Sequence, residues 1–309
     1  MDDFMIASWR FQSTIAKQTA KKEMKPQCWY HCQRDHPGTL DWLKQHEINP
    51  AAIEAILADD TRPRFQRFGP ESFVMILRGI NLNQGSEPDD MLSLRMLWHK
   101  GTLISTRKVT SKAIAIIIDK LEHHQGPESL PKLLLEIITG LHIIIDDFIH
   151  PIEALLDKID FQKGKEVQEI QTLHPKLLKL KRYLKPQKYV LQDLLASDID
   201  ELKPLNAYFR NSLDTVVRIN ESIDFYLEQF NVYLLNVSQH QAEMMNRNTY
   251  LFSMMAGIFL PAGFLTGLLG VNVGGIPGTD NPFAFSLFCI GLLTVVVLEV
   301  AILKKLRFI

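Results

Sequence analysis

The chain has 309 residues, of which 46% are hydrophobic and 22% charged, a composition that excludes a disordered or collagen-like protein. Its 34 basic and 35 acidic residues leave a formal net charge of −1, so nucleic acid is not an expected partner. Three cysteines, Cys28, Cys32 and Cys289, are too few for a disulfide scaffold and fit a reducing compartment.

Residues 1–126 are predicted to form a cytoplasmic α+β domain of the αβα type, because short strands are followed by helices. The N-terminus has no basic start followed by an apolar region, so a signal peptide is not expected. The β-rich runs, separated by turn residues, cover 28–32, 73–80, 92–99 and 102–107. The helical patterns cover 39–47, 50–58 and 110–125.

Cys28, His31 and Cys32 are residue types that bind zinc. On a strand, Cys28 and Cys32 share one face and His31 lies on the other. A single metal site from all three would be strained and is not predicted.

Residues 127–248 are predicted to be a region of long helices. One pattern runs over 129–161 with a bend at His150-Pro151, and another runs over 176–195. A third begins near Leu205 and continues into the membrane, because no Pro or Gly interrupts it from 206 to 255. Residues 206–270 would make a helix of about 98 Å. A helix of this length needs neighbours to cover it, which suggests an oligomer.

His142, Asp146 and His150 are secondary candidates for metal ligands. They fall at i, i+4 and i+8 and share one face of a helix, and nitrogen and oxygen ligands suit zinc. The alternative is an ordinary polar stripe on an amphipathic helix.

The C-terminal region is predicted to cross a membrane twice. No Lys or Arg occurs between Arg247 and Lys304, and two runs of 21 residues, 250–270 and 283–303, are almost free of charge. About 20 apolar residues span a hydrocarbon core. We therefore expect a first transmembrane helix over 249–270, an external loop over 271–282, a second transmembrane helix over 283–303 and a basic tail over 304–309. Two buried helices of a soluble protein are the alternative.

Basic residues flank the two spans rather than the loop between them. Arg247 precedes the first span, and Lys304, Lys305 and Arg307 follow the second, so both termini are expected in the cytoplasm. Glu299 lies inside the second span, where an acid is a functional candidate, for example in proton coupling. A pairing with a basic neighbour at the interface is the other interpretation.

The first span is rich in Gly, Ala, Ser and Thr. One hairpin cannot enclose a water-filled path, but several copies around an axis can, with this span inside. Close helix packing explains the small residues equally well.

The stretch FLPAGFLTGLLGVN, residues 259–272, resembles the end of the first membrane helix of CorA-type divalent-cation transporters. That family carries a Gly-Met-Asn signature where this chain has Gly270-Val271-Asn272. The valine and the following Gly-Gly-Ile-Pro-Gly resemble the zinc-transporting branch, ZntB. Four upstream segments also resemble that branch: RPRFQRFG (62–69), LRGIN (77–81), ISTRK (104–108) and RYLKPQ (182–187).

The resemblance implies a funnel-shaped homopentamer in a bacterial-type inner membrane, with divalent metal ions, most of all Zn²⁺, as the transported substrate and no prosthetic group. A magnesium or cobalt transporter of the same fold and a membrane-anchored scaffold without transport are the alternatives. Proton coupling and the direction of transport stay open.

The resemblance also assigns residues to the pore. A ring of Asn272 side chains would bind the hydrated ion at the outer mouth, beside Val271, with Gly270 giving the backbone room. Further residues on the pore side would be Gly267, Gly263, Leu260, Ala256 and Thr249. Leu260 would form a hydrophobic constriction, and Gly263 offers no polar ring.

Lys304, Lys305 and Arg307 would form a basic ring at the cytoplasmic end of the pore. Contact with lipid headgroups is an equally good role for them. The sequence contains no nucleophile-elbow, phosphate-loop or dinucleotide fingerprint, so an enzyme is not predicted.

Overall fold

The computed structural model describes residues 4–11, 16–18, 23–59, 61–159, 166–271, 276, 278 and 281–305. These residues form two compact units, the first extending to Tyr233 and the second beginning at Leu234. Each unit is described by itself below.

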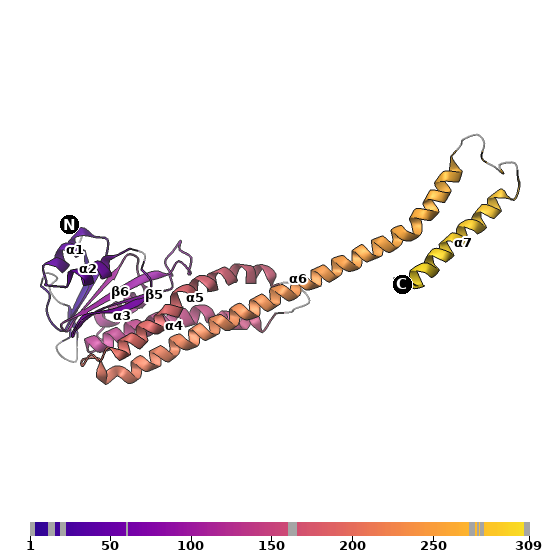
Figure 1. The fold of residues 1–309 in the computed structure, drawn as a ribbon. Coiled ribbons are helices and arrows are strands. Elements are labelled where there is room, and N and C mark those ends of the chain that lie inside the picture. The colour runs from indigo at the N-terminus through magenta and orange to yellow at the C-terminus, as the bar shows by residue number, and fades with distance from the viewer. Residues whose placement is uncertain are drawn as a thin grey trace. The chain divides into compact units, whose positions relative to one another are not determined.

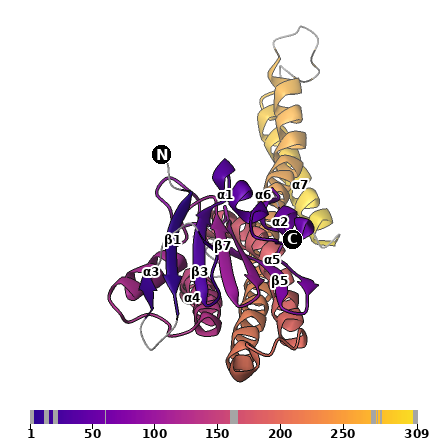
Figure 2. The same ribbon diagram turned by 90° about the vertical axis from the view of Figure 1, so that its left-hand side faces the viewer.

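A mixed seven-stranded sheet forms the centre of the first unit (Figure 2). Its strands, in the order in which they lie side by side, are β2 (Lys17–Gln18), β1 (Met5–Arg10), β3 (Cys28–Gln33), β7 (Thr102–Arg107), β6 (Leu92–His99), β5 (Ser72–Gly79) and β4 (Arg64–Gly69). Only β3 and β7 pair in parallel, with Tyr30 opposite Ile104. The other neighbours pair antiparallel and are joined in part by tight turns.

Helices cover both faces of this sheet (Figures 1 and 2). The helices α1 (Pro37–Lys44) and α2 (Pro50–Leu57) bury apolar side chains against one face. The helices α3 (Lys112–Glu122), α4 (Leu130–Leu156) and α5 (Val167–Ala196) bury theirs against the other. This two-sided arrangement confirms the αβα architecture predicted from the sequence.

Alternation along β3 assigns its side chains to the two cores. Cys28, Tyr30 and Cys32 belong to the cluster under α1 and α2, whereas Trp29 belongs to the cluster under α4. His31 lies on the same side as Trp29, and its Nδ1 atom is 2.8 Å from the hydroxyl oxygen of Ser105. Cys28 and Cys32 therefore share a face that His31 does not, as the strand period requires.

The helices of the second layer are long and have defined starts. The Ser129 hydroxyl accepts a hydrogen bond from the backbone N–H of Lys132, and Pro131 occupies the first turn of α4, where a missing N–H costs nothing. The helix continues through Pro151 to Leu156, so the bend expected at His150-Pro151 does not end it. Similarly, α5 contains Pro175 and Pro186 and begins nine residues before the predicted start at 176.

One helix, α6 (Asn206–Gly270), belongs to both units. Its first part packs in the core of the first unit through residues such as Phe209, Val216 and Phe230, which are at most 1% exposed. Its uninterrupted course through residue 255 confirms the prediction made from the lack of Pro and Gly, and Pro261 also lies inside the helix.

The second unit contains the end of α6 and α7 (Ala284–Lys305). Both helices are long and apolar enough to cross a membrane, and the most apolar stretch of each has no buried residue. These are the two spans predicted from the charge gap. The alternative, two buried helices of a soluble protein, does not fit the described helices, because α7 has no buried residue.

Three strands were not predicted. β1 and β2 lie in the N-terminal segment, and β4 is an edge strand whose charged residues hide its alternation. Phe65 and Phe68 are its partly covered side chains, while the arginines Arg64 and Arg67 face outward. A pattern with so many charges does not stand out as a strand, although charge is common on sheet edges.

Candidate functional site

The candidate site is the membrane-spanning part of α6 together with α7. Figure 1 shows α7 running antiparallel to the end of α6. A cavity of about 390 Å³ lies between the two helices near the loop. It is lined by Thr266, Leu269 and Gly270 of α6 and by Ala284, Phe285 and Phe288 of α7. The two helices therefore form a hairpin.

Each helix of the hairpin has one face that is less exposed than the rest. On α6 these partly covered residues recur at helical spacing: Met254, Ile258, Pro261, Ala262 and Leu265. On α7 they are Ala284, Phe288, Leu292, Val295, Val296, Glu299, Val300 and Leu303. Because these are the two helices that the structure describes in this unit, the two stripes are the sides that they turn toward each other.

The residues predicted to line a pore lie on the opposite side of α6. They follow one another at steps of seven, four, three, four and three residues, and all are exposed: Thr249, Ala256, Leu260, Gly263, Gly267 and Gly270. At about 100° per residue their mean direction is about 180° from the face that is turned to α7. Leu260 is 75% exposed, so nothing within the described chain covers this face at its centre.

Glycine keeps this face flat. A Cβ added at Gly263 or Gly267 would meet no atom within 4 Å. The absence of side chains therefore leaves open space that another copy of the helix or an aqueous path can occupy.

Two members of the predicted site fall outside the described part of the chain. They are Asn272, the signature residue, and Arg307, the last member of the predicted basic ring. Val271, next to Asn272, is 50% exposed. Lys304 and Lys305 lie exposed in the last turn of α7, where basic side chains suit the helix dipole.

Glu299 belongs to the partly covered stripe of α7. Its Oε2 atom is buried and has no hydrogen-bond partner among the described residues. An acid held this way within a span is costly, which keeps it a functional candidate.

The structure does not support a metal site in the first unit. Among the described residues, no group of three or more His, Cys, Asp or Glu side chains is placed to hold a metal ion. Burial separates the candidates on α4, because the His142 ring is 1% exposed whereas the His150 side chain is 83% exposed beside Glu153. Asp146 pairs instead with Arg218. Of the two interpretations of His142, Asp146 and His150, the described residues favour the ordinary polar stripe over a shared ligand set.

Sequence reasoning missed a polar cleft between α4 and α6. On α6 it is lined by residues spaced three or four apart, namely Tyr208, Asn211, Ser212, Thr215 and Arg218. This polar stripe runs beside the buried residues Phe209, Val216 and Ile219 of the same helix. Polar residues at helical spacing that face a predicted partner helix were the available signal.

Comparison with known proteins assigns the chain to a family. The sequence profile of the family described as "CorA-like Mg2+ transporter protein" matches residues 25–305. The chain is 40% identical over 307 residues to the zinc transport protein ZntB of Vibrio parahaemolyticus, covering 99% of this chain and 97% of the relative. It is 33% identical to the divalent cation transporter CmaX of Pseudomonas aeruginosa, covering 91% of this chain and 87% of the relative.

A solved structure extends this likeness to the whole fold. The structure of full-length CmaX superimposes with a TM-score of 0.85 at 29% identity, covering 99% of each chain. The proteins it resembles in sequence are transporters, not enzymes. The sequence profile, the relatives and the two apolar C-terminal helices agree, and the chain belongs to the CorA family of divalent-cation transporters.

Proposed function

We propose that this protein carries Zn²⁺ across the bacterial inner membrane through the central pore of a homopentamer. The single observation that carries the proposal is the open face of α6, on which the six pore candidates that belong to this helix lie opposite the side turned to α7. Five copies arranged with this face inward would enclose a path, and α7 would form an outer ring against lipid. The relative that is 40% identical and named a zinc transport protein supports zinc as the cargo.

The chemistry of the pore follows from its side chains. A ring of Asn272 amide oxygens at the outer mouth binds a hydrated divalent ion without stripping its water, and neutral ligands release it again. Below it, glycines expose backbone carbonyls, and the Leu260 ring forms a hydrophobic constriction. Lys304, Lys305 and Arg307 lie at the cytoplasmic end, where both termini belong by the positive-inside rule.

The test is zinc flux into liposomes that contain the purified chain and an internal zinc indicator. Asn272→Ala should abolish most of the flux. The control is Asn281→Ser in the same loop, because Asn281 accepts a hydrogen bond from the Phe283 N–H and serine keeps a capping oxygen. Flux that persists in Asn272→Ala at the level of the control would count against the proposal.

Two further measurements separate the alternatives. Light scattering in detergent should give five times the mass of one chain, and a monomer without flux would instead support a membrane-anchored scaffold. Competition among Zn²⁺, Mg²⁺ and Co²⁺ in the same flux assay identifies the cargo, since the family profile itself is described by Mg²⁺.

Proton coupling is tested in the same vesicles by imposing a pH gradient in each direction. Glu299 is the residue we assign to it, because its buried Oε2 has no partner among the described residues. Glu299→Gln should remove the response to the gradient. A flux that ignores the gradient in the unmodified protein would exclude the assignment.

A further inference from the structure

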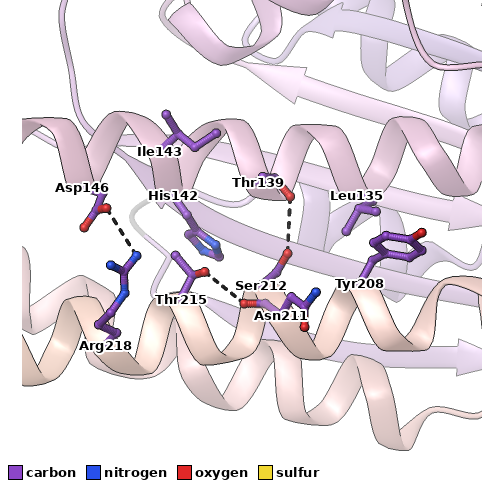
Figure 3. A pocket seen from close by; sticks show the side chains of 10 residues that line it. All are labelled: Leu135, Thr139, His142, Ile143, Asp146, Tyr208, Asn211, Ser212, Thr215 and Arg218. Atoms are coloured by element: carbon purple, nitrogen blue, oxygen red, sulfur yellow. Dashed lines mark hydrogen bonds and ion pairs between the residues drawn. The ribbon is translucent and has the colours of Figure 1, made fainter.

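A cleft of about 350 Å³ lies between α4 and α6 within the first unit (Figure 3). It runs along the two helices, from the Asp146–Arg218 pair at one end, past His142, to Tyr208 and Leu135 at the other (Figure 3). The remaining lining residues are Thr139, Ile143, Asn211, Ser212 and Thr215. Nothing in the transport proposal uses this cleft.

The imidazole of His142 points from α4 into the cleft (Figure 3). The side chain is 1% exposed, yet neither ring nitrogen has a hydrogen-bond partner among the described residues. Burial lowers the pKa of His142 to about 4, so the ring is neutral at pH 7 and carries one N–H donor. A buried donor left without a partner is costly, which indicates that something else in the cleft binds it.

The other polar groups of the cleft include four hydroxyls and the side-chain amide of Asn211. The hydroxyls of Thr139 and Ser212 lie 3.3 Å apart, and the Thr215 hydroxyl donates to the Asn211 carbonyl at 3.0 Å. Arg218 is the only basic residue that lines the cleft, and Asp146 is the only acid. Their contact is 3.4 Å long and exposed to water, so Arg218 can exchange this carboxylate for another at little cost.

We propose that this cleft binds a small carboxylate with a short apolar tail. The guanidinium of Arg218 holds the carboxylate, the His142 N–H donates to one of its oxygens, and the tail lies against Ile143. Arg–carboxylate pairs are planar and bidentate, which suits a rearrangement of the existing pair. A metal cation is disfavoured, because Arg218 repels it and the described residues offer no set of three ligands.

The probe is propionate, and its binding to the full-length chain in detergent is measured by saturation-transfer NMR. This method suits large particles. Propionamide has the same shape without the charge and is the matched ligand control. We expect propionate to bind and propionamide to bind at least about tenfold more weakly. Equal binding of the two, or no binding of propionate, overturns the proposal.

The protein variants are chosen on one helix. Arg218→Gln removes the charge and should weaken propionate at least about tenfold, because a charge-assisted pair is lost. Arg210→Gln, two turns earlier on α6 and outside the cleft lining, should leave binding within about twofold. Unchanged binding in Arg218→Gln, or an equal loss in both variants, overturns the assignment of Arg218.

A third variant tests the imidazole. His142→Phe keeps an aromatic ring but removes both nitrogens, so binding should fall while Trp fluorescence still reports a folded first unit. A folded variant that binds propionate as tightly as the unmodified chain would overturn the role of His142. If the variant does not fold, the propionamide comparison and Arg218→Gln decide the proposal.

Discussion

The side-chain oxygen of Gln187 on α5 accepts a hydrogen bond from the backbone N–H of Arg78 on β5, at 2.9 Å. Gln187 is completely buried, and the Arg78 guanidinium lies 4.9 Å from the centre of the Tyr183 ring. Two of the segments that resemble ZntB, LRGIN and RYLKPQ, therefore meet in space. Their contact fixes α5 against the sheet.

Removing this contact should destabilise the first unit. Gln187→Leu leaves the Arg78 N–H buried without its acceptor, which costs about 1–3 kcal/mol. The measurement is urea unfolding followed by Trp fluorescence, because all four tryptophans lie in the first unit. Gln168→Leu, at an exposed position of the same helix, is the control and should change stability little. Equal losses in the two variants would refute the role of the buried amide.

Acid should destabilise the first unit through two buried histidines. Burial lowers the pKa of His31 to about 3 and that of His142 to about 4, against an unfolded value near 6.5. Between pH 6.5 and 4 the unfolded chain binds more protons than the folded one, so stability falls as the pH falls through this window. Each histidine contributes a slope of at most about 1.4 kcal/mol per pH unit.

The same unfolding experiment, repeated from pH 7.5 to pH 4.5, checks this expectation. His142→Gln should make the acid-induced loss smaller, because one of the two titrating groups is gone. His150→Gln is the control, since the His150 side chain is 83% exposed. A pH dependence that is unaltered in His142→Gln would show that this ring does not remain neutral in the folded state.

The flat face of α6 can be tested with a matched pair of glycines. Gly263 and Gly291 both have no atom within 4 Å of an added Cβ, so a side chain can start at either position without meeting the rest of the chain. Gly263→Leu should strongly reduce zinc flux because it fills the proposed pore, whereas Gly291→Leu on α7 should leave the flux nearly unchanged. Zinc flux in liposomes is the measurement. Equal inhibition by both would place the pore elsewhere.

A constriction at Leu260 predicts that a smaller side chain at this position increases the zinc flux. Leu260→Ala widens a hydrophobic ring and lowers the barrier to wetting, so the zinc flux should rise severalfold. Leu265→Ala removes the same atoms from the side of α6 that is turned to α7, and it should not raise the flux. If both variants conduct like the unmodified chain, Leu260 does not form the narrow point.

How far the sequence predicted the structure depends on the kind of signal. The spans and the long α6 helix were predicted well, because a charge gap and the lack of Pro and Gly are features of contiguous residues. The strands β3, β5, β6 and β7 were also predicted, since each is a short β-rich run bounded by turns. By contrast, β4 was missed because its charges obscure the alternation, and the first nine residues of α5 lie before the predicted start at 176.

The candidate site was predictable only in part. The family resemblance put Leu260, Gly263 and Gly267 on one side of the helix, and helical spacing extended that face to Ala256 and Thr249, because such a calculation needs no partner. The α4–α6 cleft was not predicted, because its residues come from helices 60 to 80 positions apart and become neighbours only through tertiary packing. The same holds for Arg78 and Gln187, whose pairing joins residues 109 positions apart.

The small-residue face of α6 is narrow. Phe264 follows Gly263 at about 100° around the helix axis and is 66% exposed. A rotation of the helix by one residue step would therefore exchange a bare backbone for an aromatic ring at the same height. In a ring of five copies, such a twist would close an open channel with phenyl groups without moving any helix sideways.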